Sequence, residues 1–201
     1  MGSPDNLEVE VKFLVADFTA VRERLLAVGA QLDKPRIYEH NIRYDNAWEG
    51  LLRRGKLLRL RQDKIARLTY KGIPPEEVQS EAKVREELEI EVSDFATTAA
   101  ILERIGFEAR QVYEKYRETF RLGAVEVVLD EMPFGNFVEL EGEEQKIREA
   151  ADMLQLDWDK RILDNYLALM SRLKEHHNLP FDNLTFDNFA DLDISIGDLF
   201  Q

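Results

Sequence analysis

The chain has 201 residues, of which 44% are hydrophobic and 33% are charged, with a formal net charge of −13 at pH 7 and no cysteine. This composition is typical of a soluble globular protein with a sizeable core, and it excludes disulfides and thiolate metal sites. The negative charge argues against a nucleic-acid surface. Neither a secretory signal nor an apolar run of the roughly 20 residues that cross a bilayer is visible, so we expect a cytoplasmic protein and no membrane partner.

The dominant pattern is a strict alternation of apolar and charged residues, which begins with LEVEVKFLV at residues 7–15. A period of two indicates a β-strand that buries one face. The same pattern predicts further strands at residues 40–45, 56–62, 66–72, 84–92, 113–121, 125–130 and 137–142. The turn-rich segments between them separate strands of the same character, so they predict loops within one domain.

Four segments have helical spacing instead. Residues 17–29 and 94–106 each begin with an aspartate that can cap a helix and end at a glycine. Apolar stripes predict a third helix over residues 143–154 and a fourth over residues 159–174.

The first two helices belong to segments that resemble each other. VADF at residues 15–18 and VSDF at residues 92–95 each precede a helix whose glycine lies twelve residues after the aspartate, and YE follows both helices. The preceding strands also align, with Glu10 opposite Glu87. We interpret this match as an internal duplication of a strand–helix–strand unit, which predicts an α+β fold with one pseudo-symmetric closed sheet.

Six of the strands carry two or more charges each, and acidic strands are distinct from basic ones. A single strand of this kind is ordinarily half-exposed, but six together favour an enclosed face. If the helices cover the apolar faces from outside, the charges line a closed antiparallel barrel, which at about eight strands holds one small ligand. The predicted lining is Glu8, Glu10, Lys12, Arg59, Arg61, Lys71, Arg85, Glu87, Glu89, Lys115, Arg117, Asp130, Glu139 and Glu141.

Buried charges at this density are stable only when they pair, stay hydrated or bind a charged ligand. The arginines and lysines suit a ligand with several phosphates. The carboxylates would repel such a ligand unless Mg²⁺ or Mn²⁺ bridged them to its phosphate oxygens. The lining therefore predicts a polyphosphate bound together with divalent cations.

The motif EVEVK, with Glu8, Glu10 and Lys12, resembles the Glu-x-Glu-x-Lys signature of the CYTH family, the triphosphate tunnel metalloenzymes, which includes class IV adenylyl cyclases and thiamine triphosphatases. The resemblance continues in order through RLR, LTYKG, REELEIEV, YEKYR and LDEMPFGNFVELEG, and covers residues 7–173. It implies a closed eight-stranded antiparallel tunnel with helices packed outside. The tunnel domain would span residues 1–175, followed by an acidic tail over residues 176–201.

The resemblance also implies roles for individual residues. Glu10, Lys12 and Asp130 would be catalytic. The metal ligands would be Glu8, Glu10, Glu87, Glu89, Asp130, Glu139 and Glu141, and the substrate would bind to Lys12, Arg59, Arg61, Lys71, Arg85, Lys115 and Arg117. Arg43, which is not part of the family pattern, could add a phosphate contact. One departure is HNIRYD at residues 40–45, which has Asn41 and Arg43 where many members have an acidic residue followed by Tyr-Phe. This departure weakens the transfer of any member's substrate preference.

We expect a metal-dependent enzyme, with hydrolysis of a triphosphate ahead of cyclisation of ATP. Water as the nucleophile makes a triphosphatase, whereas attack by the ribose 3′-hydroxyl on the α-phosphate yields cyclic AMP and pyrophosphate. The substrate would be tripolyphosphate, thiamine triphosphate or ATP, and no motif reads adenine. The alternative of another class is a non-catalytic triphosphate or polyphosphate sensor, and a homodimer is left open.

The end of the chain offers two interpretations. From Asn178 onward it carries five aspartates and neither Lys nor Arg. Acidity alone favours disorder, but the many apolar residues favour docking on the barrel or on a second subunit.

Overall fold

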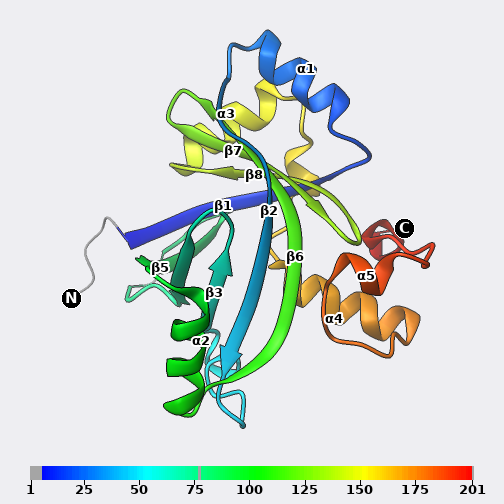
Figure 1. Ribbon diagram of the computed structural model, residues 1–201. Helices are drawn as coiled ribbons and strands as arrows, with labels where there is room; N and C mark the ends of the chain where they lie inside the picture. Colours follow the sequence, from blue (N-terminus) through cyan, green and yellow to red (C-terminus); the bar gives the residue numbers. More distant parts are fainter. Residues whose placement is uncertain (1–5, 77, 201) are drawn as a thin grey trace.

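A computed structural model describes residues 6–76 and 78–200, and its centre is a closed ring of eight antiparallel strands (Figure 1). The strands are β1 (Leu7–Val15), β2 (Gln31–Asp45), β3 (Leu57–Gln62), β4 (Ala66–Gly72), β5 (Lys83–Val92), β6 (Glu108–Leu122), β7 (Val125–Met132) and β8 (Gly135–Glu141). The prediction of a closed antiparallel barrel with outer helices is confirmed. β2 begins earlier than predicted because register shifts near Lys34 and Ile37 break its alternation while it continues to pair with β6.

The order of strands around the ring is β1-β5-β4-β3-β2-β6-β7-β8, and β8 pairs with β1. Exchanging the first four strands for the last four (β1 for β5, β2 for β6, and so on) maps every neighbouring pair onto a neighbouring pair, with β1–β5 and β2–β6 mapping onto themselves. Each half begins with a strand–helix–strand unit, whose helix is α1 (Thr19–Ala27) or α2 (Phe95–Arg104) and whose second strand has 15 residues. This symmetry is what an internal duplication produces.

Helices lie outside the ring. In Figure 1, α3 (Glu144–Met153) lies beside β7 and β8 with α1 above it, while α2 lies beside β3. The remaining helices are α4 (Tyr166–His177), α5 (Phe186–Phe189) and the 3-10 turns η2 (Leu52–Arg54), η3 (Trp158–Lys160) and η4 (Ile196–Phe200). Among residues 6–76 and 78–200, no helix combines the length and apolar character needed to cross a membrane.

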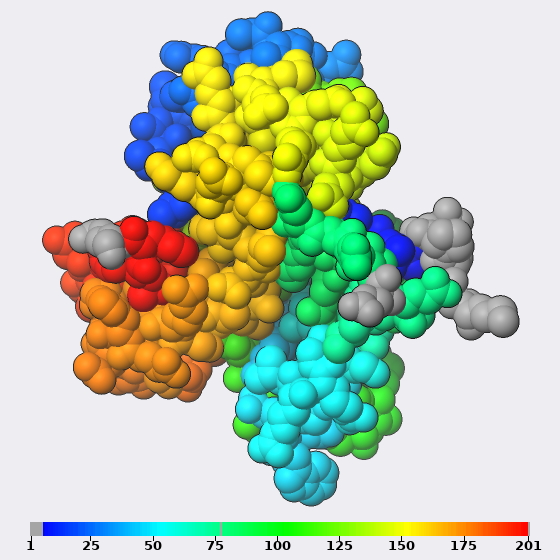
Figure 2. Space-filling model, turned by 180° about the vertical axis from the view of Figure 1, so that it is seen from behind, coloured from blue at the N-terminus to red at the C-terminus, as the bar shows by residue number. Residues whose placement is uncertain are grey.

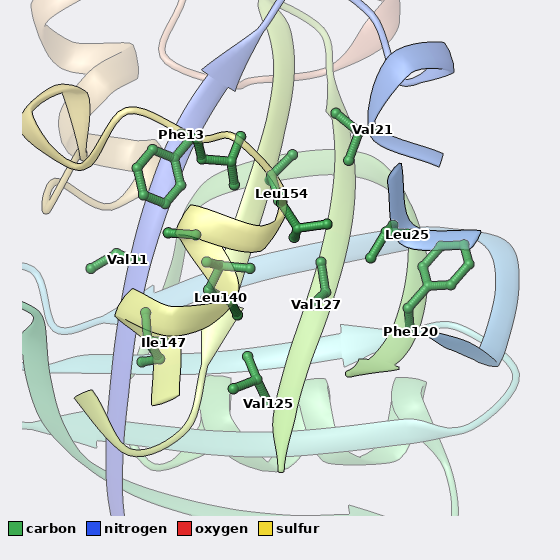
Figure 3. Packing of buried hydrophobic residues seen from close by; sticks show 14 of the residues in the cluster. Val11, Phe13, Val21, Leu25, Phe120, Val125, Val127, Leu140, Ile147 and Leu154 are labelled. Carbon is green, nitrogen blue, oxygen red and sulfur yellow. The ribbon is translucent and has the colours of Figure 1, made fainter. Parts of the chain in front are cut away.

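The main hydrophobic core lies between the outer face of the ring and helices α1 and α3 (Figure 3). Val11 of β1 and Leu140 of β8 are fully buried there, together with Leu25 of α1 and Ile147 of α3. Successive side chains of a strand point to opposite faces, so burying Val11 outside directs its neighbour Lys12 into the ring. The core therefore stabilises the fold on the outside and leaves the interior to charged groups.

A second apolar cluster joins α4 and the end of the chain to the barrel. It includes Phe137 of β8, Leu173 of α4, and Leu184 and Phe189 from the last residues. Leu184 also makes two backbone hydrogen bonds of 2.9 Å with β6, through the amide of Glu114 and the carbonyl of Val112. In the rear view the orange and red end of the chain forms one lobe, apart from α1 and α3 (Figure 2). The acidic segment thus packs on its own barrel.

The prediction of a continuous helix over residues 159–174 is wrong. A 3-10 turn ends at Lys160, and α4 begins only at Tyr166, where Asn165 caps it by accepting a hydrogen bond from the amide of Ala168 at 2.9 Å. Between them, Ile162 pairs with the backbone of Lys12 through hydrogen bonds of 2.7 and 3.1 Å. β1 pairs with β5 only up to Glu10. Ile162 therefore pairs with backbone groups of β1 that lie beyond the end of its pairing with β5. This extended pairing is incompatible with a helix at residue 162.

Candidate functional site: the charged interior of the barrel

The ring encloses a cavity of about 320 Å³ that is lined mostly by charged side chains. The predicted residues that line it are Glu8, Glu10, Lys12, Arg59, Arg61, Lys71, Glu87, Glu89, Lys115, Arg117, Glu139 and Glu141. Since most of their side chains are buried, their charges act in a medium of low dielectric and must be balanced locally. The pairing inside the cavity therefore determines what it can bind.

A cationic wall forms on β6 around one carboxylate. Asp130 of β7 is fully buried, and Lys115 donates to its Oδ2 at 2.8 Å. Arg117 donates to the same carboxylate through Nε at 2.7 Å and Nη2 at 2.5 Å. The hydroxyl of Tyr166 donates to Oδ2 at 2.9 Å, and the Nζ atoms of Lys12 and Lys115 lie 5.5 and 5.4 Å from its ring centroid. Asp130 and Tyr166 thus hold the cations that face the cavity.

A second cationic group lies on β3. Arg59 donates to the hydroxyl of Thr69 at 3.1 Å, and Arg61 lies 3.2 Å from the carboxylate of Glu89 and 3.5 Å from that of Glu39. Burial opposes ionisation of Glu39, but Lys115 and the surrounding arginines lower its pKa to about 2. Glu39 is therefore the internal counter-charge of this group.

Carboxylates gather on β1 and β8. Lys12 is almost completely buried and lies between Glu10 (2.9 Å) and Glu139 (3.1 Å). Although burial opposes it, Lys12 and Lys83 together hold the pKa of Glu10 well below its usual range. Lys71 donates to both oxygens of Glu8, at 2.6 and 2.5 Å. On these two strands, the predicted metal ligands Glu8, Glu10 and Glu139 are thus already paired with cations of the protein.

Glu141 differs from these carboxylates. It lies opposite Glu10 in the β1–β8 pairing and opposite Glu126 in the β7–β8 pairing. Burial, together with the nearby Glu8 and Glu126, raises the pKa of Glu141 to about 8. This end of the cavity has an excess of carboxylate that a cation would relieve.

The donor set fits a hard divalent cation, because it consists of carboxylate oxygens without sulfur or imidazole. Across residues 6–76 and 78–200, no three His, Asp or Glu side chains already stand in a metal-binding group. Glu8 and Glu10 would have to exchange a lysine for the metal, whereas Glu141 needs no such exchange.

Comparison with known proteins identifies the architecture. A family model described as the CYTH domain matches residues 6–165, which is most of the chain. The chain belongs to the CYTH family. The predicted resemblance to the CYTH family is thus confirmed.

Relatives and solved structures agree with this membership. The "putative adenylate cyclase" of Methanocaldococcus jannaschii is 27% identical over 188 residues, which cover 92% of this chain and 98% of that protein. The structure of a "putative adenylate cyclase" from Vibrio parahaemolyticus has a TM-score of 0.73 at 22% identity, over 83% of this chain and 98% of that one. The "putative adenylyl cyclase" structure from Hippeastrum has a TM-score of 0.57 at 17% identity, over 82% and 95% of the two chains. At these identities the two structures establish the fold alone.

Three predicted residues of the CYTH tunnel do not line the cavity. Asp130 lies behind the wall, with its oxygens taken by Lys115, Arg117 and Tyr166. Arg43 is buried beside Asp45 (3.4 Å) and Glu49 (3.0 Å). The guanidinium of Arg85 donates to backbone carbonyls, including that of Gly72 at 2.9 Å. Their positions do not support direct contact with metal or substrate.

Several residues of the tunnel were not predicted. Glu39 and Lys83 each continue a period-two pattern by one further residue beyond the predicted strand, so the signal was present in the alternation. Tyr166 lies on a helix whose stripe predicts only burial, and Asn165 and Leu167 beside it also line the cavity. Nothing in the sequence indicates that the start of α4 closes part of the tunnel.

Proposed function

We propose that this CYTH protein is a divalent-metal-dependent triphosphatase that binds a triphosphate within its tunnel. The observation that carries the proposal is the opposition of two walls, with buried cations on β3 and β6 and an excess of carboxylate where β1 meets β8. A triphosphate would bind to cations that buried carboxylates already hold in place, and a metal would relieve the excess of carboxylate. The two ligands together engage both walls.

The roles follow from the contacts. Arg59, Arg61, Lys115 and Arg117 would bind phosphate oxygens, the arginines as planar forks and the lysine as a point charge. Glu8, Glu10, Glu139 and Glu141 would hold the metal. When bound, the metal would supply Lewis-acid stabilisation of phosphate charge and a water of lowered pKa.

Lys12 is placed to act on both ligands. It already contacts Glu10 and Glu139, and its buried position fixes its ammonium group at the boundary between the carboxylates and the cations. Burial opposes protonation of Lys12, but these two carboxylates raise its pKa, so it stays charged in the neutral range. Lys12 would therefore stabilise charge that develops on the phosphate being transferred, as an electrostatic rather than a proton-transfer residue.

Hydrolysis is favoured over cyclisation by the nature of the lining. The two aromatic residues of the cavity are Tyr113 and Tyr166; both are buried, and the Tyr166 hydroxyl is taken by Asp130. Among the described residues, the cavity thus offers a nucleobase little exposed aromatic surface for stacking, whereas a water molecule needs none. The Hippeastrum protein of the same fold is described as having a dominant triphosphatase activity.

Adenylyl cyclase is the second candidate, and the observation that favours it is the name of the Methanocaldococcus jannaschii relative. The protein would be incubated with Mg²⁺ or Mn²⁺ and tripolyphosphate, thiamine triphosphate or ATP, and the products separated. We expect orthophosphate and the shortened polyphosphate or diphosphate. Cyclic AMP with pyrophosphate would overturn hydrolysis, and metal-dependent binding without turnover would favour a sensor.

The assigned site is tested by Glu10→Ala and Lys12→Ala. Both should lose at least about a hundredfold in kcat, because each removes a charged group from the electrostatic machinery. Glu131→Gln is the control, since Glu131 pairs with Arg36 on the exposed outer side of the barrel. Full activity in both tunnel variants, with the fold intact by circular dichroism, would show that the site lies elsewhere.

A further inference from the structure

Lys83 is a cation of the tunnel to which the proposed function gives no role. It is the first residue of β5 and lies directly opposite Glu10 in the β1–β5 pairing. Its Nζ donates to Oε1 of Glu10 at 2.6 Å, while Oε2 of the same carboxylate lies 2.9 Å from Nζ of Lys12. Ammonium groups therefore occupy both oxygens of Glu10.

The two lysines are not equivalent. Lys12 has a second carboxylate partner in Glu139 at 3.1 Å, so losing one contact leaves it paired. Within residues 6–76 and 78–200, the ion pairs of Lys83 involve Glu10 alone. Lys83 also has more freedom to move, since its side chain is 17% exposed against 3% for Lys12. If Glu10 is to ligate a metal, Lys83 is the group that leaves.

The surroundings of Lys83 determine which partner its ammonium group can contact after it leaves Glu10. Lys83 lines the same cavity as the cations that face the substrate, and burial together with Lys12 lowers its pKa. An ammonium released from Glu10 would therefore remain in a partly buried, cation-rich site unless a new anion met it. A phosphate oxygen of a triphosphate in the cavity is such an anion.

We propose that in the metal-free protein the ammonium of Lys83 occupies the oxygen of Glu10 that would otherwise ligate a metal. When metal and triphosphate bind together, Lys83 moves from Glu10 to a phosphate oxygen. This inference rests on the proposed function. A metal bound to Glu10 without triphosphate would leave the Lys83 ammonium without an anionic partner. A triphosphate bound without metal could not pair with Lys83, because Lys83 would still be paired with Glu10. Each ligand therefore raises the affinity for the other, and the coupling is reciprocal.

The test is calorimetric titration of the metal-free protein with Mn²⁺, alone and with imidotriphosphate, the tripolyphosphate analogue whose bridging oxygens are replaced by NH. Lys83→Met keeps the side-chain length and removes the charge. We expect the variant to bind Mn²⁺ alone about tenfold more tightly than the wild type, and the enhancement by the analogue to fall by about tenfold, within the usual range of coupling between sites. Lys64→Met, in the exposed β3–β4 turn, changes the net charge equally and should change neither value.

Two results would overturn the inference. One is a Lys83→Met variant that binds Mn²⁺ alone no more tightly than the wild type. The other is independent binding of Mn²⁺ and the analogue to the wild-type protein. This result needs no variant, so it does not depend on whether Lys83→Met folds. A wild-type protein that hydrolyses triphosphate but shows no coupling refutes the role of Lys83 alone. Coupled binding without hydrolysis refutes the triphosphatase and leaves Lys83 in place.

Discussion

The two walls of the tunnel differ in how completely their charges are satisfied. On β6 and β7, the carboxylate of Asp130 is fully buried and accepts hydrogen bonds from Lys115, Arg117 and Tyr166. Where β1 meets β8, Glu141 lies among other carboxylates, and burial with Glu8 and Glu126 raises its pKa to about 8. One wall is complete in the free protein, and the other lacks a cation.

This difference teaches how the barrel can be stable and still bind two ligands. Cations that are held by buried counter-charges need no reorganisation when phosphate arrives, so the first wall is preorganised. The second wall keeps some repulsion that metal binding relieves. A substitution that removes a counter-charge from the complete wall should destabilise the protein. A substitution that removes a carboxylate from the incomplete wall should stabilise it.

The largest effect is expected from Asp130→Asn. This change preserves shape but removes the negative charge between Lys115 and Arg117, and breaking a buried charge network costs about 3–5 kcal/mol. Urea unfolding with EDTA present measures the loss. The KM for tripolyphosphate should also rise, because the two cations would no longer be held in one geometry.

The neighbouring residue supplies the control. Glu131 pairs with Arg36 at 2.8 Å on the outer face, with both side chains well exposed. Exposed pairs contribute little, so Glu131→Gln should cost less than about 1 kcal/mol. Equal losses in the two variants would mean that Asp130 does not organise the wall.

A smaller effect with a defined pH dependence is expected for Glu39. Burial opposes its ionisation, yet Lys115 and the arginines lower its pKa to about 2, from an ordinary value of 4.5. A depressed pKa stabilises the native state above the unfolded value, so this contribution is present above about pH 4.5 and is lost as the pH falls toward 2. Glu39→Gln should therefore be roughly 2–3 kcal/mol less stable at pH 7.

The measurement is urea unfolding of both proteins at a series of pH values from 7 to 3. The difference between wild type and Glu39→Gln should shrink steadily below pH 4.5, and Glu131→Gln should show no such trend. A constant difference over the whole range would mean that packing, not charge, is what Glu39 contributes.

The sequence predicts the complete and the incomplete wall to different degrees. Glu8, Glu10 and Lys12 could be placed inside the ring because a period of two is local: burying Val9 and Val11 leaves the charges no other face. The duplication predicted the closed sheet for a similar reason, since two equivalent halves repeat the same alternation. The choice of interior face therefore needed only short segments of sequence.

Pairing within the interior could not be predicted in the same way. Asp130 alternates as a lining residue should, but its contact with Tyr166 depends on where α4 begins, and that depends on Ile162 pairing with Lys12. Lys83 meets Glu10 only because β5 pairs with β1 in one register. Strand register and the residue at which α4 begins depend on tertiary contacts. From the sequence alone, the same charged residues could therefore have been assigned as metal ligands, phosphate binders or members of ion pairs.

The smallest effect, and the one of opposite sign, is expected for Glu141→Gln. Removing one carboxylate from the group with Glu8 and Glu126 relieves repulsion, so the metal-free variant should gain about 1 kcal/mol at pH 8, since a raised pKa is a cost to the charged form. The same change removes a metal ligand, so the stabilisation that Mn²⁺ gives the wild type should decrease. Thermal unfolding in EDTA and in Mn²⁺ measures both terms, with Glu91→Gln as the exposed control on β5. If Glu141→Gln were less stable in EDTA and kept the full Mn²⁺ effect, Glu141 would be an ordinary partner of the barrel. The wall formed by β1 and β8 would then not be the side that lacks a cation.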